Sequence, residues 1–289
     1  MSVKCIAECG ANHAGSLQTA KDMVTVLASY VKCDVVKFQK RTTSEMPEEV
    51  RSRPYTGQHS FGATYGEHRD ALELDMDEHR ELKKFCEQQG VEYSCSVWDT
   101  TAAMQIAELK PSFIKIPSAC NLDFDMINVL LSCYKGDIHI SLGMTTANER
   151  ERIKCFIRDT ETPERFVVYF CTSAYPCEYE DVYMQDLWIG KYWRGSPGIK
   201  NYGFSGHHKG IAIDMAAVAM NIGYLERHFT LDRTAKGTDH AASLEPDGMR
   251  KLVRDVRNTE AAFKHRNVGL DEVLPCEEAP RKKMKTCVQ

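Results

Sequence analysis

The chain has 289 residues and a formal net charge of −4 at pH 7, from 37 lysines and arginines against 41 aspartates and glutamates. This length allows one large α/β domain or two small ones, and no Ser-, Gly- or Pro-rich linker divides it, so we expect a single domain. The mixed charge argues against a broad nucleic-acid surface, and the sequence contains neither an apolar run of about 20 residues for a membrane nor a recognisable signal peptide.

The first predicted strand follows the amino terminus directly and ends at Ile6-Ala7-Glu8. Ser16 is a good N-cap for a helix that carries apolar residues at helical spacing as far as Leu27. The second strand, residues 34–38, precedes the longest stretch without periodicity, roughly residues 41–74. This stretch is rich in Arg, His and aromatic residues, which predicts an ordered lid over a site rather than a disordered loop.

Further helices are predicted between the later strands. One covers residues 77–89 and stops at Gly90, a typical C-cap. Others are expected near residues 100–109, 124–134, 146–158, 180–192, 210–221 and 245–264. We assign residues 1–276 to one domain and predict that residues 277–289, which are charged and interrupted by proline, form a frayed tail.

Eight short apolar runs in the chain each end in polar residues. Strands that alternate with helices predict a parallel sheet, and eight such units predict a (β/α)8 TIM barrel with its site at the carboxyl ends of the strands. A doubly wound sheet is the alternative, but the count of eight and the absence of a G-x-G-x-x-G motif favour the barrel. Residues near the eight strand ends include Glu8, Gln39, Ser96, Ser118, Ser141, Ser173, His207 and His228.

The twelve cysteines contain no C-x-x-C pair, and several lie in or near predicted strand ends. Their spacing makes metal binding by thiolates improbable and favours reduced, partly buried thiols. Together with the missing signal peptide, this pattern predicts a cytoplasmic protein.

Two histidines end strands that are neighbours in a closed barrel. The imidazoles of His207 and His228 can converge on one divalent cation and leave positions for water and substrate. Either histidine alone is more often a satisfied barrel residue. His208 and His240 compete for the same role, and the sequence does not rank them.

Two lysines, Lys37 and Lys115, lie inside strands that should be buried. A buried lysine must be neutralised or must meet an anion. Hydroxyl groups nearby complete a candidate site for phosphate and carboxylate. Internal salt bridges to Glu8 are the alternative, but one carboxylate cannot neutralise two cations, so anion binding is favoured. The hydroxyls belong to Ser96, Ser118, Ser141 and Ser205.

Three further polar residues can hydrogen-bond a polyol: Gln39, Tyr175 and Asp239. Each also has a structural interpretation that involves no ligand. Tyr175-Pro176 is more often a loop anchor, and Asp239 can cap a turn after Gly237.

Seven segments of the chain, in order from residue 3 to about residue 276, resemble the sialic acid synthases. The lid sequence at residues 53–60 and 66–69 looks most like the animal-type enzymes, which act on N-acetylmannosamine 6-phosphate. The segments are IAECGANHAG (6–15), KFQ (37–39), KIPS (115–118), CTSAYP (171–176), GFSGH (203–207), ERHFTLD (226–232) and GTDHAASLEP (237–246).

The resemblance implies a condensation of phosphoenolpyruvate with an N-acylmannosamine, which yields a sialic acid and inorganic phosphate. It implies that His207 and His228 hold Mn²⁺, Mg²⁺ or a similar ion, that Glu8 lies beside the reacting groups, and that Gln39, Tyr175 and Asp239 face the sugar. Arg53 of the lid is expected to bind a sugar 6-phosphate. Family members dimerise partly through the carboxyl-terminal cap, so the sequence leaves open whether this chain forms a homodimer. The residues expected around phosphoenolpyruvate are Lys37, Ser96, Lys115, Ser118, Ser141, Thr172 and Ser205.

Three departures from the family pattern bear on activity. Cys120 stands where related enzymes place a carboxylate, and Leu142 replaces a small hydroxyl residue. The sequence also ends soon after Cys276, where the family usually continues into an antifreeze-like domain that caps the sugar site of a partner subunit. We therefore expect a more open site, or one completed by another polypeptide or by the lid arginines. A synthase for another aldose and a catalytically silent barrel that binds phosphate esters or a full-length synthase are the rival interpretations.

Overall fold

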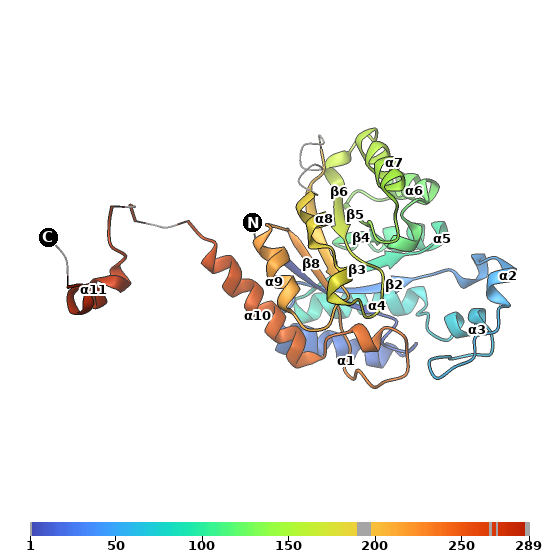
Figure 1. Cartoon of the computed structure of the whole chain (residues 1–289). Helices are drawn as coiled ribbons and strands as arrows, with labels where there is room; N and C mark the ends of the chain where they lie inside the picture. Colours follow the sequence, from blue (N-terminus) through green and yellow to red (C-terminus); the bar gives the residue numbers. More distant parts are fainter. Residues whose placement is uncertain (1, 190–197, 266–267, 270, 287–289) are drawn as a thin grey trace.

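A computed structural model describes residues 2–189, 198–265, 268–269 and 271–286. Eight parallel strands close into a barrel in sequence order, which confirms the predicted (β/α)8 architecture (Figure 1). The strands are β1 (Lys4–Gly10), β2 (Val35–Lys40), β3 (Glu92–Val97), β4 (Phe113–Ile116), β5 (Asp137–Ser141), β6 (Phe166–Phe170), β7 (Asn201–Gly206) and β8 (Tyr224–His228).

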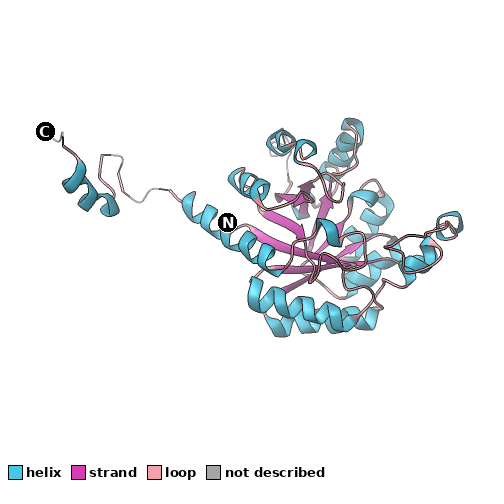
Figure 2. Cartoon of the chain, turned by 60° about the horizontal axis from the view of Figure 1, so that its bottom comes forward, coloured by secondary structure: helices cyan, strands magenta, loops and turns pink. Residues whose placement is uncertain are grey.

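Helices surround the strands, as Figure 2 shows. A π-helical turn, η1 (Leu27–Val31), extends the first helix. The helices between and after the strands are α1 (Leu17–Val26), α4 (Met76–Gln89), α5 (Thr100–Glu108), α6 (Phe124–Cys133), α7 (Ala147–Arg158), α8 (Met184–Ile189), α9 (Ala212–Ala219) and α10 (Pro246–Ala262).

Local capping signals place the helix ends. Ser16 caps α1, because its hydroxyl accepts a hydrogen bond from the backbone N–H of Thr19. Gly90 ends α4 in the left-handed conformation at φ 74°, as predicted. The helix predicted over residues 180–192 is shorter, since α8 begins only at Met184, and its predicted end after Ile189 lies outside the described residues.

The lid stretch is more regular than predicted. It contains a 3-10 turn, η2 (Thr43–Glu45), and two short helices, α2 (Glu48–Arg51) and α3 (Tyr65–Asp70). A capping box between Thr64 and Glu67 starts α3. These helices are too short and polar to produce the apolar periodicity from which a helix is predicted.

The tail also differs from the prediction of a frayed end. A 3-10 turn, η8 (Pro275–Glu277), leads into α11 (Glu278–Met284), which lies apart from the barrel in Figure 1. Its acidic residue at the start and its three basic residues in the last turn, Arg281 to Lys283, match the helix dipole and favour this short helix. None of the helices in the described part of the chain is long and apolar enough to cross a bilayer.

Alternate strand residues point into the barrel, and their character changes along its axis. At the amino-terminal end the interior is filled by an apolar and aromatic cluster, with Phe113 stacked at 3.7 Å on His139. Tyr169 of this cluster donates or accepts a hydrogen bond at His139 Nδ1, 2.9 Å away. This packed floor closes the barrel and leaves the polar residues at the carboxyl ends of the strands to form the site.

Candidate active site

Strand register brings the predicted site residues side by side. In the parallel pairing, Glu8 of β1 is opposite Lys37 of β2 and also opposite His228 of β8. On the other side of β2, Gln39 is opposite Ser96 of β3. Neighbouring strands thus bring cations, carboxylates and hydroxyls to one level inside the barrel.

Lys37 and Lys115 are buried, at 1% and 4% exposure, and two carboxylates neutralise them. Lys37 pairs with Glu8 and lies 3.6 Å from Glu226, while Lys115 Nζ is 2.6 Å from the same Glu226. The sequence analysis named only Glu8 as a counter-ion and therefore underestimated internal pairing. Glu226 lies two residues before His228 in β8, so the two-residue strand period is the signal that identifies it as an inward side chain.

The charge states of the cluster follow from these contacts. Burial alone raises the pKa of Glu226, but Lys115 and Lys37 outweigh burial and hold that pKa well below its usual range. The two carboxylates in turn keep the pKa of Lys37 raised despite its burial. Lys115 has a lowered pKa, because burial and the charge of Lys37 outweigh Glu226.

Glu8 differs from Glu226, because burial raises its pKa to about 7 against the opposing charge of Lys37. A carboxyl group that titrates near neutral pH can both give and take a proton there. Gly10, at φ +50°, permits a close approach to this group. A Cβ atom at Gly10 would lie 3.2 Å from Glu8 and 3.4 Å from Asp239 Oδ2, which places these two carboxyl groups beside each other.

A cavity of about 240 Å³ opens above this cluster. Lys37 Nζ donates to Ser96 Oγ over 2.6 Å, and Ser205 Oγ donates to Glu226 over 3.1 Å. Twelve of the fourteen residues predicted for the site line this cavity: Glu8, Lys37, Gln39, Ser96, Lys115, Ser118, Ser141, Tyr175, Ser205, His207, His228 and Asp239.

The predicted histidine pair is present in the cavity wall. The rings of His207 and His228 are 5.3 Å apart, and the Tyr175 ring lies 4.3 Å from His207. His207 Nδ1–H donates to the carbonyl oxygen of Thr172 over 2.7 Å, which leaves the Nε2 lone pair free to bind a cation. Burial lowers the pKa of His207 to about 3 and also lowers that of His228, so both rings are neutral at pH 7.

Two neutral imidazoles in this arrangement fit a divalent ion, for which metal–nitrogen distances are about 2.1 Å. Asp239 Oδ2 lies 3.9 Å from His228 Nδ1, a buried nitrogen without a hydrogen bond. No three His, Cys, Asp or Glu side chains in the described ranges form a ready ligand set. An ion held by the pair would therefore complete its coordination with water or substrate.

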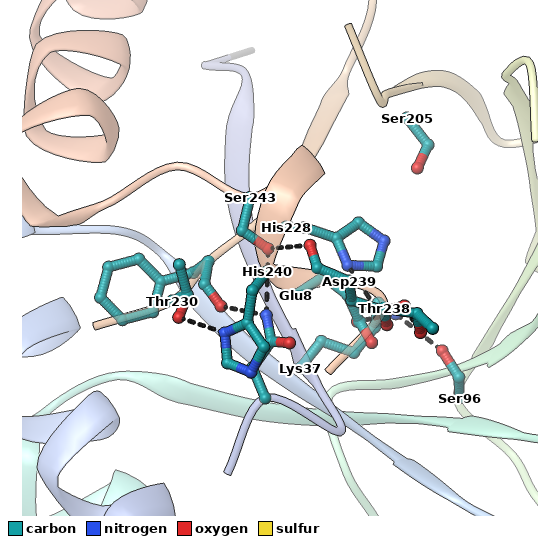
Figure 3. A network of polar contacts seen from close by, with 12 residues as sticks. Glu8, Lys37, Ser96, Ser205, His228, Thr230, Thr238, Asp239, His240 and Ser243 are labelled. Atoms are coloured by element: carbon teal, nitrogen blue, oxygen red, sulfur yellow. Dashed lines mark hydrogen bonds and ion pairs between the residues drawn. The ribbon is translucent and has the colours of Figure 1, made fainter. Parts of the chain in front are cut away.

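The two competing histidines are engaged elsewhere. His208 Nε2 lies 3.4 Å from Asp214 and 3.2 Å from Arg227, outside the cavity wall. His240 Nδ1 forms a 2.7 Å hydrogen bond with Thr230 Oγ1, as Figure 3 shows. Neither ring lines the cavity, which separates them from His207 and His228.

The loop that carries Asp239 is anchored to the turn that follows β1. The backbone carbonyl of Asp239 accepts a hydrogen bond from Ser243 Oγ (Figure 3). The Ser243 hydroxyl in turn accepts one from the Asn12 amide. The Asp239 side chain does not cap the turn that follows it. Its carboxylate lines the cavity and also accepts a hydrogen bond from Thr238 Oγ1 over 3.0 Å.

Two predicted site residues do not line the cavity. The hydroxyl of Thr172 donates to the carbonyl of Asp181 and borders a separate, smaller cavity of about 70 Å³. Its backbone carbonyl, rather than its hydroxyl, serves the site by orienting His207. Arg53 is exposed, and its Nε–H donates to the carbonyl of Glu49.

The sequence analysis did not predict Arg41 and Trp98 as site residues, although both line the cavity. Arg41 directly follows β2, and its guanidinium carbon lies 3.3 Å from the centre of the Trp98 ring, a second wall residue. Cys120 does not line the cavity, and its thiol donates to the Trp98 carbonyl over 3.4 Å. Burial raises the pKa of Cys120 to about 11, so this thiol is protonated at neutral pH.

Comparison with known proteins gives one consistent result. The family model "NeuB family" matches residues 23–267. The chain is 38% identical over 281 residues to the N-acetylneuraminate-9-phosphate synthase of Homo sapiens, which covers 96% of this chain and 75% of that protein. It is 33% identical to the enzyme of the same name from Drosophila melanogaster, over 98% and 80% of the two chains. An N-acetylneuraminic acid synthetase structure from Leptospira borgpetersenii superposes with a TM-score of 0.79 over 99% and 94% of the chains, at 24% identity.

Proposed function

The chain belongs to the NeuB family, and from that premise we propose that it condenses phosphoenolpyruvate with N-acetylmannosamine or its 6-phosphate, releasing a sialic acid and inorganic phosphate. The enzyme is thus a carbon–carbon bond-forming transferase. The observation that carries the proposal is the single cavity lined by Lys37, Lys115, His207 and His228. This cavity combines donors for an anionic substrate with two neutral nitrogens for a metal ion.

Phosphoenolpyruvate is assigned to the lysine and serine side of the cavity. An ammonium group has three donor hydrogens, and Lys115 uses one of them for Glu226. The others can bind phosphate or carboxylate oxygens, with Ser118 and Ser141 nearby in the wall.

The acceptor is assigned to the side formed by Gln39, Tyr175 and Asp239. His207 and His228 would hold Mn²⁺ or Mg²⁺, which when bound acts as a Lewis acid on the aldehyde oxygen. The methylene carbon of phosphoenolpyruvate forms the new bond to the aldehyde carbon, and water adds at the former enol carbon before phosphate leaves. The aldehyde oxygen gains a proton and the added water loses one, and Glu8, with its pKa near 7, can carry both transfers. When the bond to phosphate breaks, the remaining hydroxyl of that carbon becomes the keto oxygen and its proton leaves with the phosphate.

The proposal is tested by phosphate release from phosphoenolpyruvate with Mn²⁺ and either N-acetylmannosamine, its 6-phosphate or mannose 6-phosphate. Release that depends on an N-acylmannosamine is the expected result. Release with mannose 6-phosphate alone would assign a different acceptor, and no release from protein that binds phosphoenolpyruvate would indicate a silent barrel.

A matched variant tests the metal assignment. His207→Ala is expected to abolish metal-dependent turnover and to weaken Mn²⁺ binding measured by calorimetry, while the circular dichroism spectrum is retained. Unchanged turnover would overturn the assignment. His240→Ala is the control histidine, because His240 bonds to Thr230 and does not line the cavity.

A further inference from the structure

We propose that Arg227, held by its ion pair with Asp214, is a positioning residue that sets the spacing of the two histidines assigned to the metal ion. The inference rests on the proposed function, because it concerns the ion that His207 and His228 would hold. Arg227 does not line the cavity. It therefore acts through the backbone that carries the two histidines and does not touch the substrate.

Arg227 lies between the strands and the helices, in a layer that is filled mainly by the hydrophobic core. In β8, Glu226 and His228 line the cavity inside the barrel, so Arg227 between them points outward, toward α9. The side chains of Arg227 and Asp214 both have 0% exposure. A matched apolar pair is often as stable as a buried ion pair of this kind. Stability alone therefore does not explain why two charges lie in this layer.

The guanidinium group of Arg227 supplies hydrogen bonds that an apolar side chain cannot make. Its Nη2 donates to the backbone carbonyl of His208 over 2.6 Å, and its Nη1 donates to that of Gly210 over 2.8 Å. Nη1 also donates to His208 Nε2, 3.2 Å away. A planar group with several donors holds these acceptors in fixed relative directions. The loop that begins after His207 is thus hydrogen-bonded to the residue that directly precedes His228.

The pairing of β7 with β8 brings this contact next to the histidine pair. Gly206 is opposite Arg227 in the strand register. A Cβ atom at Gly206 would lie 3.0 Å from Arg227 Cδ and 2.9 Å from His208 Cε1, so a larger residue would displace both side chains. Because His207 follows Gly206 and His228 follows Arg227, this close packing lies one residue before both histidines.

Other hydrogen bonds orient His207 by itself. Its Nδ1–H donates to the Thr172 carbonyl, and its own backbone carbonyl accepts a hydrogen bond from the Cys177 N–H over 3.0 Å. Arg227 differs from these partners because it links the backbone next to His207 with the backbone next to His228. An ion bound by both imidazoles needs both nitrogens at about 2.1 Å, so a change in their separation weakens binding.

The test replaces the ion pair by apolar side chains in Asp214→Leu/Arg227→Met and measures Mn²⁺ binding by calorimetry. The Kd for Mn²⁺ is expected to rise about 10- to 100-fold, the usual effect of losing a group that orients metal ligands. Tm should remain close to that of wild type, because no uncompensated charge stays buried. The Kd for phosphoenolpyruvate, measured without metal, should not change, because Lys37 and Lys115 lie in β2 and β4.

The ion pair between Arg257 and Asp34 offers a matched control. Arg257 Nη2 lies 2.6 Å from Asp34, and Arg257 also donates to a backbone carbonyl, that of Val3, near the amino ends of β1 and β2. Asp34→Leu/Arg257→Met should leave the Kd for Mn²⁺ unchanged even where it lowers Tm. A purely structural role of Arg227 predicts instead that Mn²⁺ affinity falls with stability in both double variants.

Arg227→Lys keeps the test decisive if the apolar double variant does not fold. Lysine keeps the charge opposite Asp214, but a single ammonium group does not reproduce the fixed fork of a guanidinium. Mn²⁺ affinity should therefore still fall, while most of the stability is retained.

Three results would overturn the inference. They are an unchanged Kd for Mn²⁺ in a folded Arg227 variant, an equal rise of the Kd for phosphoenolpyruvate, and a wild type that does not bind Mn²⁺. The last result would also overturn the metal assignment. A wild type that binds Mn²⁺ without releasing phosphate would refute the condensation alone, because the comparison of Mn²⁺ affinities still decides the role of Arg227.

Discussion

The buried pair between Arg227 and Asp214 is expected to be a large single contribution to stability. Both side chains have 0% exposure, and the pair joins β8 to α9. Arg227 also donates to the carbonyl oxygens of His208 over 2.6 Å and of Gly210 over 2.8 Å. It thereby fixes the loop that follows His207 to the strand that ends at His228.

Asp214→Asn removes the charge that compensates Arg227 while keeping the size of the side chain. Leaving one member of a buried pair uncompensated typically costs about 3–5 kcal/mol. The unfolding entropy is about 2.1 cal/mol/K per residue, or about 0.6 kcal/mol/K for the whole chain, so Tm should fall by about 5–8 °C. Thermal unfolding followed by circular dichroism or calorimetry measures this shift.

The double variant Asp214→Leu/Arg227→Met separates the pair from the packing around it. Replacing both charges by apolar side chains should restore most of the loss, because no uncompensated charge remains. A shift below about 1 kcal/mol for Asp214→Asn would refute the reasoning. The reasoning would also be refuted if the double variant lost as much unfolding free energy as the two single variants lose together.

Three further predictions concern residues outside the cavity wall. Burial lowers the pKa of His79 to about 3, so below pH 6.5 the unfolded chain takes up a proton that the native chain does not. The unfolding free energy should therefore be unaffected by this residue above pH 6.5 and should fall between pH 6.5 and pH 3, by at most about 5 kcal/mol. The slope of unfolding free energy against pH should be smaller in His79→Leu, and an identical slope would exclude this residue. Cys120→Ser should keep the rate of phosphate release within about twofold, because serine also donates to the Trp98 carbonyl. Cys120→Asp should not raise this rate. A large change of the rate in either variant would show that the thiol takes part in the reaction. Ser16→Ala should lower the unfolding free energy by about 1 kcal/mol through loss of the N-cap in urea denaturation, whereas an equal loss in Ser16→Asp would contradict a capping role.

Much of the fold could be predicted because its signals are local. The apolar runs set the eight strands, and the Ser16 cap and the left-handed Gly90 set the ends of helices by interactions within a few residues. Which reactive residues lie at the ends of strands can likewise be read from their positions along the sequence. In a closed parallel barrel, all such ends face one side, so the sequence located the site as a whole.

The tertiary structure decided which side chains enter the site and which partners they meet. Lys115 and Glu226 are separated by 111 positions in sequence, and only the closure of the barrel makes them an ion pair. Thr172 follows β6, but its hydroxyl turns to another loop while its carbonyl orients His207.

For the lid arginines and the histidines, too, only the tertiary structure shows which of them enter the site. Their residue types are alike in sequence, so composition cannot separate exposed Arg53 from Arg69, or His208 from His207. The separation depends on short helices and loop paths that are fixed by contacts between distant segments, such as Arg227 with Asp214. The sequence by itself therefore determined the barrel and the chemical types at its open end, while packing between strands, lid and loops decided which of those groups share one cavity.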